Sequence, residues 1–263
     1  MLRRLLSVVL ALVATQAAGQ TPAGTLGFYR FPSVHGQLVV FAAEGDLWSV
    51  PLTGGLAHRL TSHPAEETDP AISPDGKTLA YTARYEGPAA LYTMPIAGGA
   101  PTRWTYDGDA ALATGWTPDG KLVYRTFQYT GIPKSGLVQL NIADGTRTPV
   151  PLAGASEASY DASGKTVYFA RPGFHNNVTK RYTGGTARNI WKYTAGAAEA
   201  VNLTGDYKGE SHSPMWWSNG RVYFVSDRSG TMNVWSMAED GTDKKQVTRH
   251  AAGLETSAVG DTL

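Results

Sequence analysis

The stretch Pro70-Ala-Ile-Ser-Pro74-Asp75-Gly76-Lys-Thr-Leu-Ala-Tyr81 contains the motif that decides the fold. It predicts a strand, a tight turn and a second strand, because proline presets φ, aspartate caps the turn and glycine adopts positive φ. Further on, Ala90-Leu-Tyr-Thr-Met-Pro-Ile96 is typical of a third strand, Gly98-Gly99 of a turn, and Thr102-Arg-Trp-Thr105 of a fourth strand. The unit therefore predicts four consecutive antiparallel strands.

The glycine that opens the second strand of this unit recurs along the chain. Its copies are Gly36, Gly76, Gly120, Gly164, Gly220 and Gly260, at intervals of 40, 44, 44, 56 and 40 residues. These intervals match the length of one four-stranded propeller blade. No long stretch after residue 20 has helical periodicity. We therefore predict an all-β fold, a β-propeller of four-stranded TolB/WD40-like blades with five complete blades and the start of a sixth.

Large aromatic residues occupy one phase of this repeat, at Trp48, Tyr92, Trp191 and Trp235. A single blade cannot bury both of its faces, so neighbouring blades must cover each other. Large aromatic side chains dominate such buried surfaces. We expect these four residues to pack between blades rather than to bind a ligand.

The first twenty residues differ in kind from the rest. Arg3-Arg4 forms a positive start, residues 5–14 form an apolar run, and Ala17-Ala-Gly19 provides small residues for cleavage. This pattern predicts a signal peptide over residues 1–20, too short to act as an ordinary membrane anchor. The remaining residues, 21–263, are expected to form one incomplete N-terminal β-propeller that ends within blade six. The predicted location is periplasmic or secreted, with no membrane association after cleavage.

Charge and composition exclude several functions. The formal net charge is +1, and removal of Arg3 and Arg4 makes it −1, which is too low for the basic surface that nucleic-acid binding requires. The chain has no cysteine, and therefore no disulfide, thiolate metal site or cysteine nucleophile. The nearest approach to a serine nucleophile motif, Gly154-Ala-Ser156-Glu-Ala158, lacks the second glycine. We expect no catalytic residue, no metal site and no cofactor in this chain.

His63, Glu66 and Glu67 together could suggest a metal or acid–base cluster. The repeat favours another interpretation, because Glu67, Glu210 and Glu255 follow Thr61, Thr204 and Thr248 at nearly the same spacing. A carboxylate that recurs at one blade position is better explained as a structural hydrogen-bond acceptor between blades. We therefore predict a structural role for these glutamates.

The interval of 56 residues reflects an insertion from Arg171 to Arg188. Its basic residues Lys180, Arg181 and Arg188 could form a peptide-contacting loop on one face of the propeller. The alternative is a long solvated hairpin whose charges only keep it soluble. Both interpretations remain open at the level of sequence.

Two segments of the chain resemble bacterial tricorn-type peptidases. The first runs from Phe31 to Gly76 and includes Glu44-Gly-Asp-Leu-Trp48; the second is Lys180-Arg-Tyr-Thr-Gly-Gly-Thr-Ala-Arg-Asn-Ile-Trp191. Members of this family are large modular serine peptidases in which a six-bladed propeller precedes a second propeller, a PDZ module and a catalytic domain. None of the family's catalytic positions falls within this chain. The secretion signal departs from the cytosolic archetype of the family.

The resemblance implies a non-catalytic N-terminal propeller of an exported tricorn-like serine peptidase, which would admit or channel peptides to a downstream catalytic domain. The expected partners are peptides, the downstream domains of the same polypeptide and possible further copies of the chain. One alternative is a TolB-like periplasmic protein-binding scaffold. Another is the propeller of a different exported hydrolase, such as an amidohydrolase.

Overall fold

The structure, a computed structural model, describes residues 28–130, 135–172 and 181–254. Every regular element in these ranges is a β-strand, and the 20 strands form five four-stranded sheets. Each sheet consists of four consecutive strands in antiparallel order. The prediction of an all-β propeller with five complete blades is confirmed. The predicted start of a sixth blade, at Gly260, lies outside the described residues, as does the predicted signal peptide.

The strand bounds of the first three blades are as follows. Blade 1 contains β1 (Arg30–His35), β2 (Leu38–Ala43), β3 (Asp46–Pro51) and β4 (His58–Arg59). Blade 2 contains β5 (Glu67–Ile72), β6 (Thr78–Ala83), β7 (Ala90–Pro95) and β8 (Thr102–Arg103). Blade 3 contains β9 (Ala111–Trp116), β10 (Leu122–Thr126), β11 (Gly136–Leu140) and β12 (Arg147–Pro149).

The last two blades flank the insertion. Blade 4 contains β13 (Ala158–Tyr160), β14 (Thr166–Arg171), β15 (Asn189–Thr194) and β16 (Val201–Asn202). Blade 5 contains β17 (Ser211–Trp217), β18 (Arg221–Ser226), β19 (Asn233–Ala238) and β20 (Lys245–Gln246). The insertion predicted from the repeat is therefore the connection between β14 and β15.

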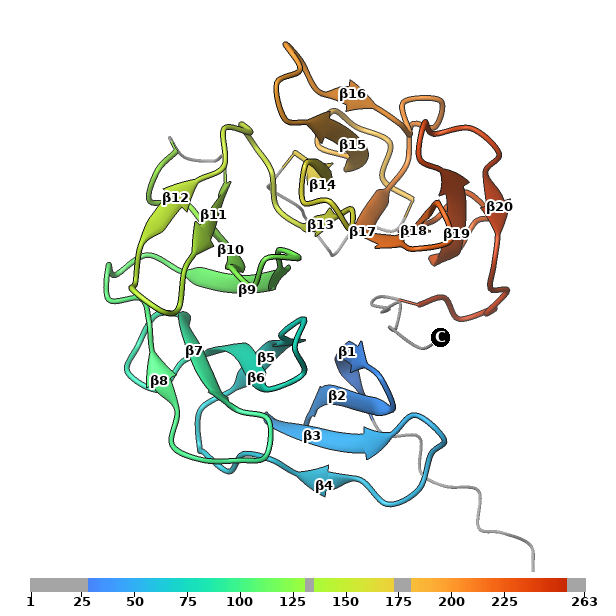
Figure 1. Cartoon of the computed structure of the whole chain (residues 1–263). Helices are drawn as coiled ribbons and strands as arrows, with labels where there is room; N and C mark the ends of the chain where they lie inside the picture. Colours follow the sequence, from blue (N-terminus) through green and yellow to red (C-terminus); the bar gives the residue numbers. More distant parts are fainter. Residues whose placement is uncertain (1–27, 131–134, 173–180, 255–263) are drawn as a thin grey trace, which may run out of the picture.

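The five blades follow one another around a common axis (Figure 1). The first strand of each blade lies nearest the centre, and the fourth lies at the periphery. The inner strands β1, β5, β9, β13 and β17 pack on one another in sequence order. Among the described strands, no strand of blade 5 packs on a strand of blade 1 as closely as the strands of successive blades do.

Four apolar clusters fill the spaces between successive blades. Val40 and Leu47 of blade 1 pack with Leu79 and Tyr81 of blade 2, and equivalent clusters join blades 2 and 3, 3 and 4, and 4 and 5. Strand alternation explains this arrangement, because residues i and i+2 share one face of a strand and can therefore cover one neighbour. Burial between blades is thus the main stabilising contribution to the fold.

Three of the four repeated aromatic residues occupy these clusters. Tyr92, Trp191 and Trp235 each pack against the preceding blade, which confirms their predicted role. Trp48 is half-buried and pairs with Phe41 across the sheet, on the face of blade 1 opposite to the Val40–Leu47 side. The same repeat position therefore lies on the face of blade 1 that points away from blade 2.

In four blades, a threonine that follows the fourth strand accepts a hydrogen bond from the third strand through its hydroxyl. The backbone N–H groups of Leu47, Leu91, Ile190 and Val234 donate to the hydroxyls of Thr61, Thr105, Thr204 and Thr248, respectively, at 2.8–3.0 Å. In blade 3 the residue after Val150 is Pro151, which has no hydroxyl. These threonines, which follow Leu60, Trp104, Leu203 and Val247, thus hold the end of four of the five blades against the third strand.

The turn at Gly76 requires glycine for two reasons. Its φ of +69° lies in the left-handed region, which side chains rarely adopt. A Cβ atom at this position would also lie 2.7 Å from Nε2 of His35, which belongs to the adjacent blade 1. The Pro-Asp-Gly turn therefore serves both the hairpin and the approach of the neighbouring blade.

Candidate functional site

Four of the five inner strands share an irregularity near the propeller axis. The pairing registers of β1, β5, β9 and β17 each shift once, which marks a β-bulge. Phe31, Asp69 and Ser213 have φ values of about 50° at these bulges, and Gly115 has a φ of 146°. Bulges redirect side chains and backbone groups, so they determine which polar groups meet between the inner ends of neighbouring blades.

One buried ionic network, the Arg188 network, joins blades 4 and 5 near the inner strands. It consists of Arg188, Glu157 and Glu210. Nη1 of Arg188 lies 2.8 Å from Oε1 of Glu157, and Nε lies 3.0 Å from Oε2 of Glu210. Arg188 is 7% exposed and Glu210 1% exposed. The planar guanidinium can serve two carboxylates at once because its donors point in fixed directions.

The bulge in β17 completes this network. The backbone N–H of Ser213 donates to Oε2 of Glu157, and the N–H of Glu210 donates to Oδ1 of Asp227 at 3.0 Å. Burial raises the pKa of Glu157, but Arg188, His212 and the Ser213 N–H outweigh burial, so that the pKa lies below its ordinary value. Glu157 is therefore held as a carboxylate between two blades.

The three basic residues predicted to contact peptides occupy different environments. Lys180 lies outside the described residues. Arg181 is exposed, and its Nε donates to the carbonyl of Gly230 in the β18–β19 connection at 3.1 Å. Arg188 belongs to the Arg188 network and bridges blades. Contact with peptides stays a prediction for this loop. Of its two described residues, Arg181 is exposed and Arg188 is buried, so they do not form one exposed basic patch.

A second buried glutamate, Glu67, joins blades 1 and 2. Glu67 is completely buried, and its two oxygens accept hydrogen bonds from the hydroxyls of Thr61 and Tyr85. Glu67 and Glu210 thus each bond across a blade boundary, which confirms the predicted structural role. Glu255 lies outside the described residues. Burial raises the pKa of Glu67, and the hydrogen bonds from Thr61 and Tyr85 only partly oppose this effect.

Glu67 should therefore make the stability of the propeller depend on pH. A carboxyl whose pKa is raised on folding keeps its proton in the native state while the unfolded state has already released it. The free energy of unfolding of the wild type, relative to Glu67→Gln, is expected to fall as pH rises above the ordinary glutamate pKa of 4.5 and through the raised pKa of Glu67. Urea unfolding of both proteins between pH 4 and 8 measures this difference.

Glu66→Gln is the matched control, because Glu66 is the adjacent residue and forms an exposed ion pair with Arg30 at 2.9 Å. It reports the effect of removing one surface carboxylate. A wild-type minus Glu67→Gln difference that stays constant with pH, or rises, would contradict the burial argument.

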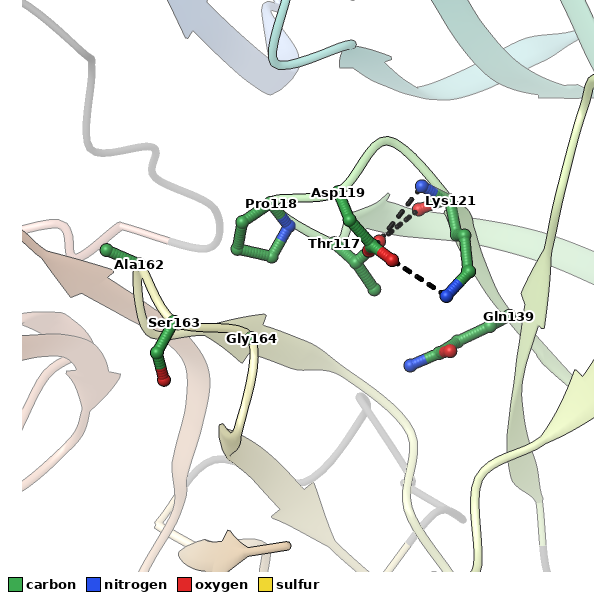
Figure 2. A pocket seen from close by; sticks show the side chains of 8 residues that line it. All are labelled: Thr117, Pro118, Asp119, Lys121, Gln139, Ala162, Ser163 and Gly164. Carbon is green, nitrogen blue, oxygen red and sulfur yellow. Dashed lines mark hydrogen bonds and ion pairs between the residues drawn. The ribbon is translucent and has the colours of Figure 1, made fainter.

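A polar hollow of about 370 Å³ lies between blades 3 and 4 (Figure 2). It is lined by Thr117, Pro118, Asp119, Lys121, Gln139 and the Ala162-Ser163-Gly164 turn. Asp119 accepts a hydrogen bond from Lys121 at 2.7 Å, and Gln139 donates to the hydroxyl of Tyr160 at 3.1 Å. These polar groups already have partners within the protein, so the hollow provides little to recognise a ligand.

A second hollow, of about 310 Å³, is lined by the end of the insertion and by the segment after β16. Gly184, Gly185 and Gly205 contribute backbone to it, and Lys208 contributes an exposed side chain. The amide of Asn189, also on its wall, is already bonded to Thr204 and Ala187. The described end of the insertion thus lines this hollow as well as leading into β15.

The described residues contain no cluster of three or more metal-binding side chains. They also contain no helix that is long and apolar enough to span a bilayer.

Sequence reasoning did not identify Glu157, whose importance depends on Arg188 and Ser213. These residues are 31 and 56 positions away along the chain. An available signal was the spacing, because Glu157 follows Pro151 by six residues, as Glu67 follows Thr61. The correspondence is concealed because blade 3 ends in Pro151, which stands where the other units have the threonine.

The five four-stranded sheets, arranged around one axis, define a β-propeller. Residues 26–261 match the family described as the tricorn protease N-terminal beta propeller domain. The chain belongs to this family.

Curated relatives agree with this assignment. Tricorn protease homolog 1 of Streptomyces coelicolor is 33% identical over 244 residues, which cover 89% of this chain and 23% of the relative. Putative tricorn protease homolog 2 of the same organism is 30% identical over 250 residues, which cover 90% of this chain and 21% of the relative. The chain thus spans about a quarter or less of the length of these relatives.

Solved structures share the fold. The crystal structure of the tricorn protease superposes with a TM-score of 0.76 at 23% identity, over 86% of this chain and 23% of that chain. The structure of putative TolB from Agrobacterium tumefaciens superposes with a TM-score of 0.69 at 22% identity, over 84% of this chain and 80% of that chain. At these identities the superpositions establish the architecture alone.

Proposed function

We propose that this propeller admits or guides peptides toward a catalytic domain carried elsewhere in an exported tricorn-like serine peptidase. The observation that carries the proposal is the family match over residues 26–261, which spans all five blades. The inner strands are arranged around one axis, and an axial passage would select by diameter, favouring extended peptides over folded proteins (Figure 1).

Export is the second part of the proposal. It rests on the signal-like composition of residues 1–20, which precede the family match. The periplasm or the exterior is then the compartment of action. N-terminal sequencing of the protein recovered from the periplasm and medium tests this part, since cleavage near Ala17-Ala-Gly19 is expected and an intact Met1 would contradict it.

Obstruction of the axis tests the guiding role. The chain has no cysteine, so a single introduced cysteine is a unique attachment point within it. Thr114 is half-buried on the inner strand β9, whereas His58 is exposed on the outer strand β4. In the full-length protein, with any other cysteine replaced by serine, each position is changed to cysteine and coupled to a bulky maleimide.

Attachment at Thr114→Cys is expected to slow the turnover of peptides by tenfold or more, because the polymer would occupy the axis. Attachment at His58→Cys is expected to leave turnover nearly unchanged. Equal turnover of the two conjugates would contradict a guiding role. Absence of any peptidase activity from the full-length protein, even unlabelled, would instead favour a TolB-like scaffold or the propeller of another hydrolase.

A further inference from the structure

Arg171 lies at the end of β14, where the insertion begins, and its guanidinium rests on two aromatic rings. The guanidinium carbon is 4.8 Å from the ring centre of Trp191 and 5.1 Å from that of Phe169. Phe169 and Trp191 both belong to the apolar cluster between blades 3 and 4. The side chain is half-buried, so it is held by the core while part of it still reaches solvent.

No described carboxylate compensates this charge. The other arginines that stack on aromatic rings are Arg30, Arg103 and Arg228, and they form ion pairs with Glu66, Glu86 and Asp206, respectively. Nε of Arg171 is buried and has no hydrogen-bond partner among the described residues. Burial also lowers the pKa of Arg171. A partly desolvated charge of this kind is unfavourable unless an opposite charge binds beside it.

The described part of the chain does not supply that opposite charge. Residues 173–180, which follow Arg171, contain no aspartate or glutamate. Glu157 is the acidic residue whose backbone bonds to the neighbouring Ala170, but its two carboxylate oxygens already accept from Arg188 and Ser213. The partner of Arg171 is therefore sought outside the described residues, in a bound ligand.

We propose that Arg171 is a binding site for a carboxylate-bearing ligand in the wall between blades 3 and 4. The aromatic rings orient the guanidinium plane, and burial of Nε leaves the Nη1 and Nη2 edge as the available pair of donors. Two parallel donors match the two oxygens of a carboxylate. The proposal concerns binding only and does not depend on the peptidase assignment, although an acidic peptide is the natural ligand if that assignment holds.

Titration of the 263-residue chain with acetate tests this site. Backbone amide NMR signals of Trp191 and Gly154 are followed at constant ionic strength, since Gly154 lies near the Arg171 side chain. Saturable shifts are expected, with half-saturation on the order of 10 mM, because a partly exposed ion pair is weak. Acetamide, a neutral molecule of nearly the same shape, is expected to produce no saturable shift.

Two substitutions and one matched control locate the binding. Arg171→Met is expected to abolish the acetate shifts, and Arg171→Lys to weaken binding roughly tenfold, because lysine keeps the charge but loses the paired donors. Arg103→Met is the control, since Arg103 also stacks on an aromatic ring but has its own carboxylate partner. It is expected to leave the acetate shifts unchanged. Arg171→Lys keeps the proposal testable if Arg171→Met does not fold.

Three ligands separate the possible sources of the carboxylate. A short peptide with a free C-terminus, the same peptide amidated, and the amidated peptide with one glutamate are compared. Binding of the first or third, but not of the second, supports the site and identifies which carboxylate it takes. Equal binding of inorganic phosphate and acetate would overturn the carboxylate assignment. Acetate shifts that survive Arg171→Lys and Arg171→Met unchanged would overturn the site itself.

Discussion

Replacement of Arg188 by methionine is expected to destabilise the propeller by about 3–5 kcal/mol, because it leaves buried carboxylates without their cation. Arg188 bridges Glu157 and Glu210 across the boundary of blades 4 and 5. Urea unfolding at pH 7 measures the loss as a lower transition midpoint. Arg181→Met is the matched control, since Arg181 belongs to the same insertion but is exposed, and it is expected to cost less than about 1 kcal/mol.

A second variant distinguishes a lost ionic network from simple loss of packing. The triple substitution Arg188→Met, Glu157→Leu and Glu210→Leu removes all three charges together. It is expected to be more stable than Arg188→Met alone, because an apolar replacement of a buried ionic group avoids the unpaired charge. If the triple variant is less stable than Arg188→Met, the carboxylates contribute through contacts other than Arg188.

Truncation of Phe224 to alanine is the second substitution with a large expected effect, about 3–5 kcal/mol. Phe224 is completely buried and packs with Tyr168 and Ile190 between blades 4 and 5. The cost combines the lost transfer of the ring from water with the cavity left behind. Thermal and urea unfolding of the wild type and of Phe224→Ala provide the measurement.

Leucine at position 224 and alanine at position 56 serve as controls. Phe224→Leu retains most of the apolar volume and is expected to cost clearly less than Phe224→Ala. Leu56 is 78% exposed, so Leu56→Ala is expected to change stability by no more than about 0.5 kcal/mol. Similar losses for Phe224→Ala and Leu56→Ala would contradict the assignment of the main stabilisation to burial between blades.

Together these substitutions separate two contributions to one boundary. Phe224 represents the apolar cluster, which supplies most of the free energy of association between blades. The Arg188 network lies nearer the inner strands and joins the blades by directed bonds. Its geometry depends on the bulge at Ser213, whose backbone N–H bonds to Glu157.

The sequence alone determined the blades. The turn at Pro74-Asp75-Gly76 and its repeats specify where strands end, because only certain residues adopt the turn conformations. Alternation of apolar residues then assigns one face of each strand to a neighbour. The recurrence of Glu67 and Glu210 also predicted their structural role, since a repeated position in a repeated fold meets a similar environment.

Only the tertiary structure decided which charges meet. Lys180, Arg181 and Arg188 are equivalent as basic residues of one insertion, yet Arg188 is buried between two carboxylates and Arg181 is exposed. Arg171 resembles Arg103 and Arg228 in its stacking, but within the described chain it has no carboxylate partner. Local sequence cannot determine these differences, because the energy of a charge depends on its burial and on partners that are distant in sequence.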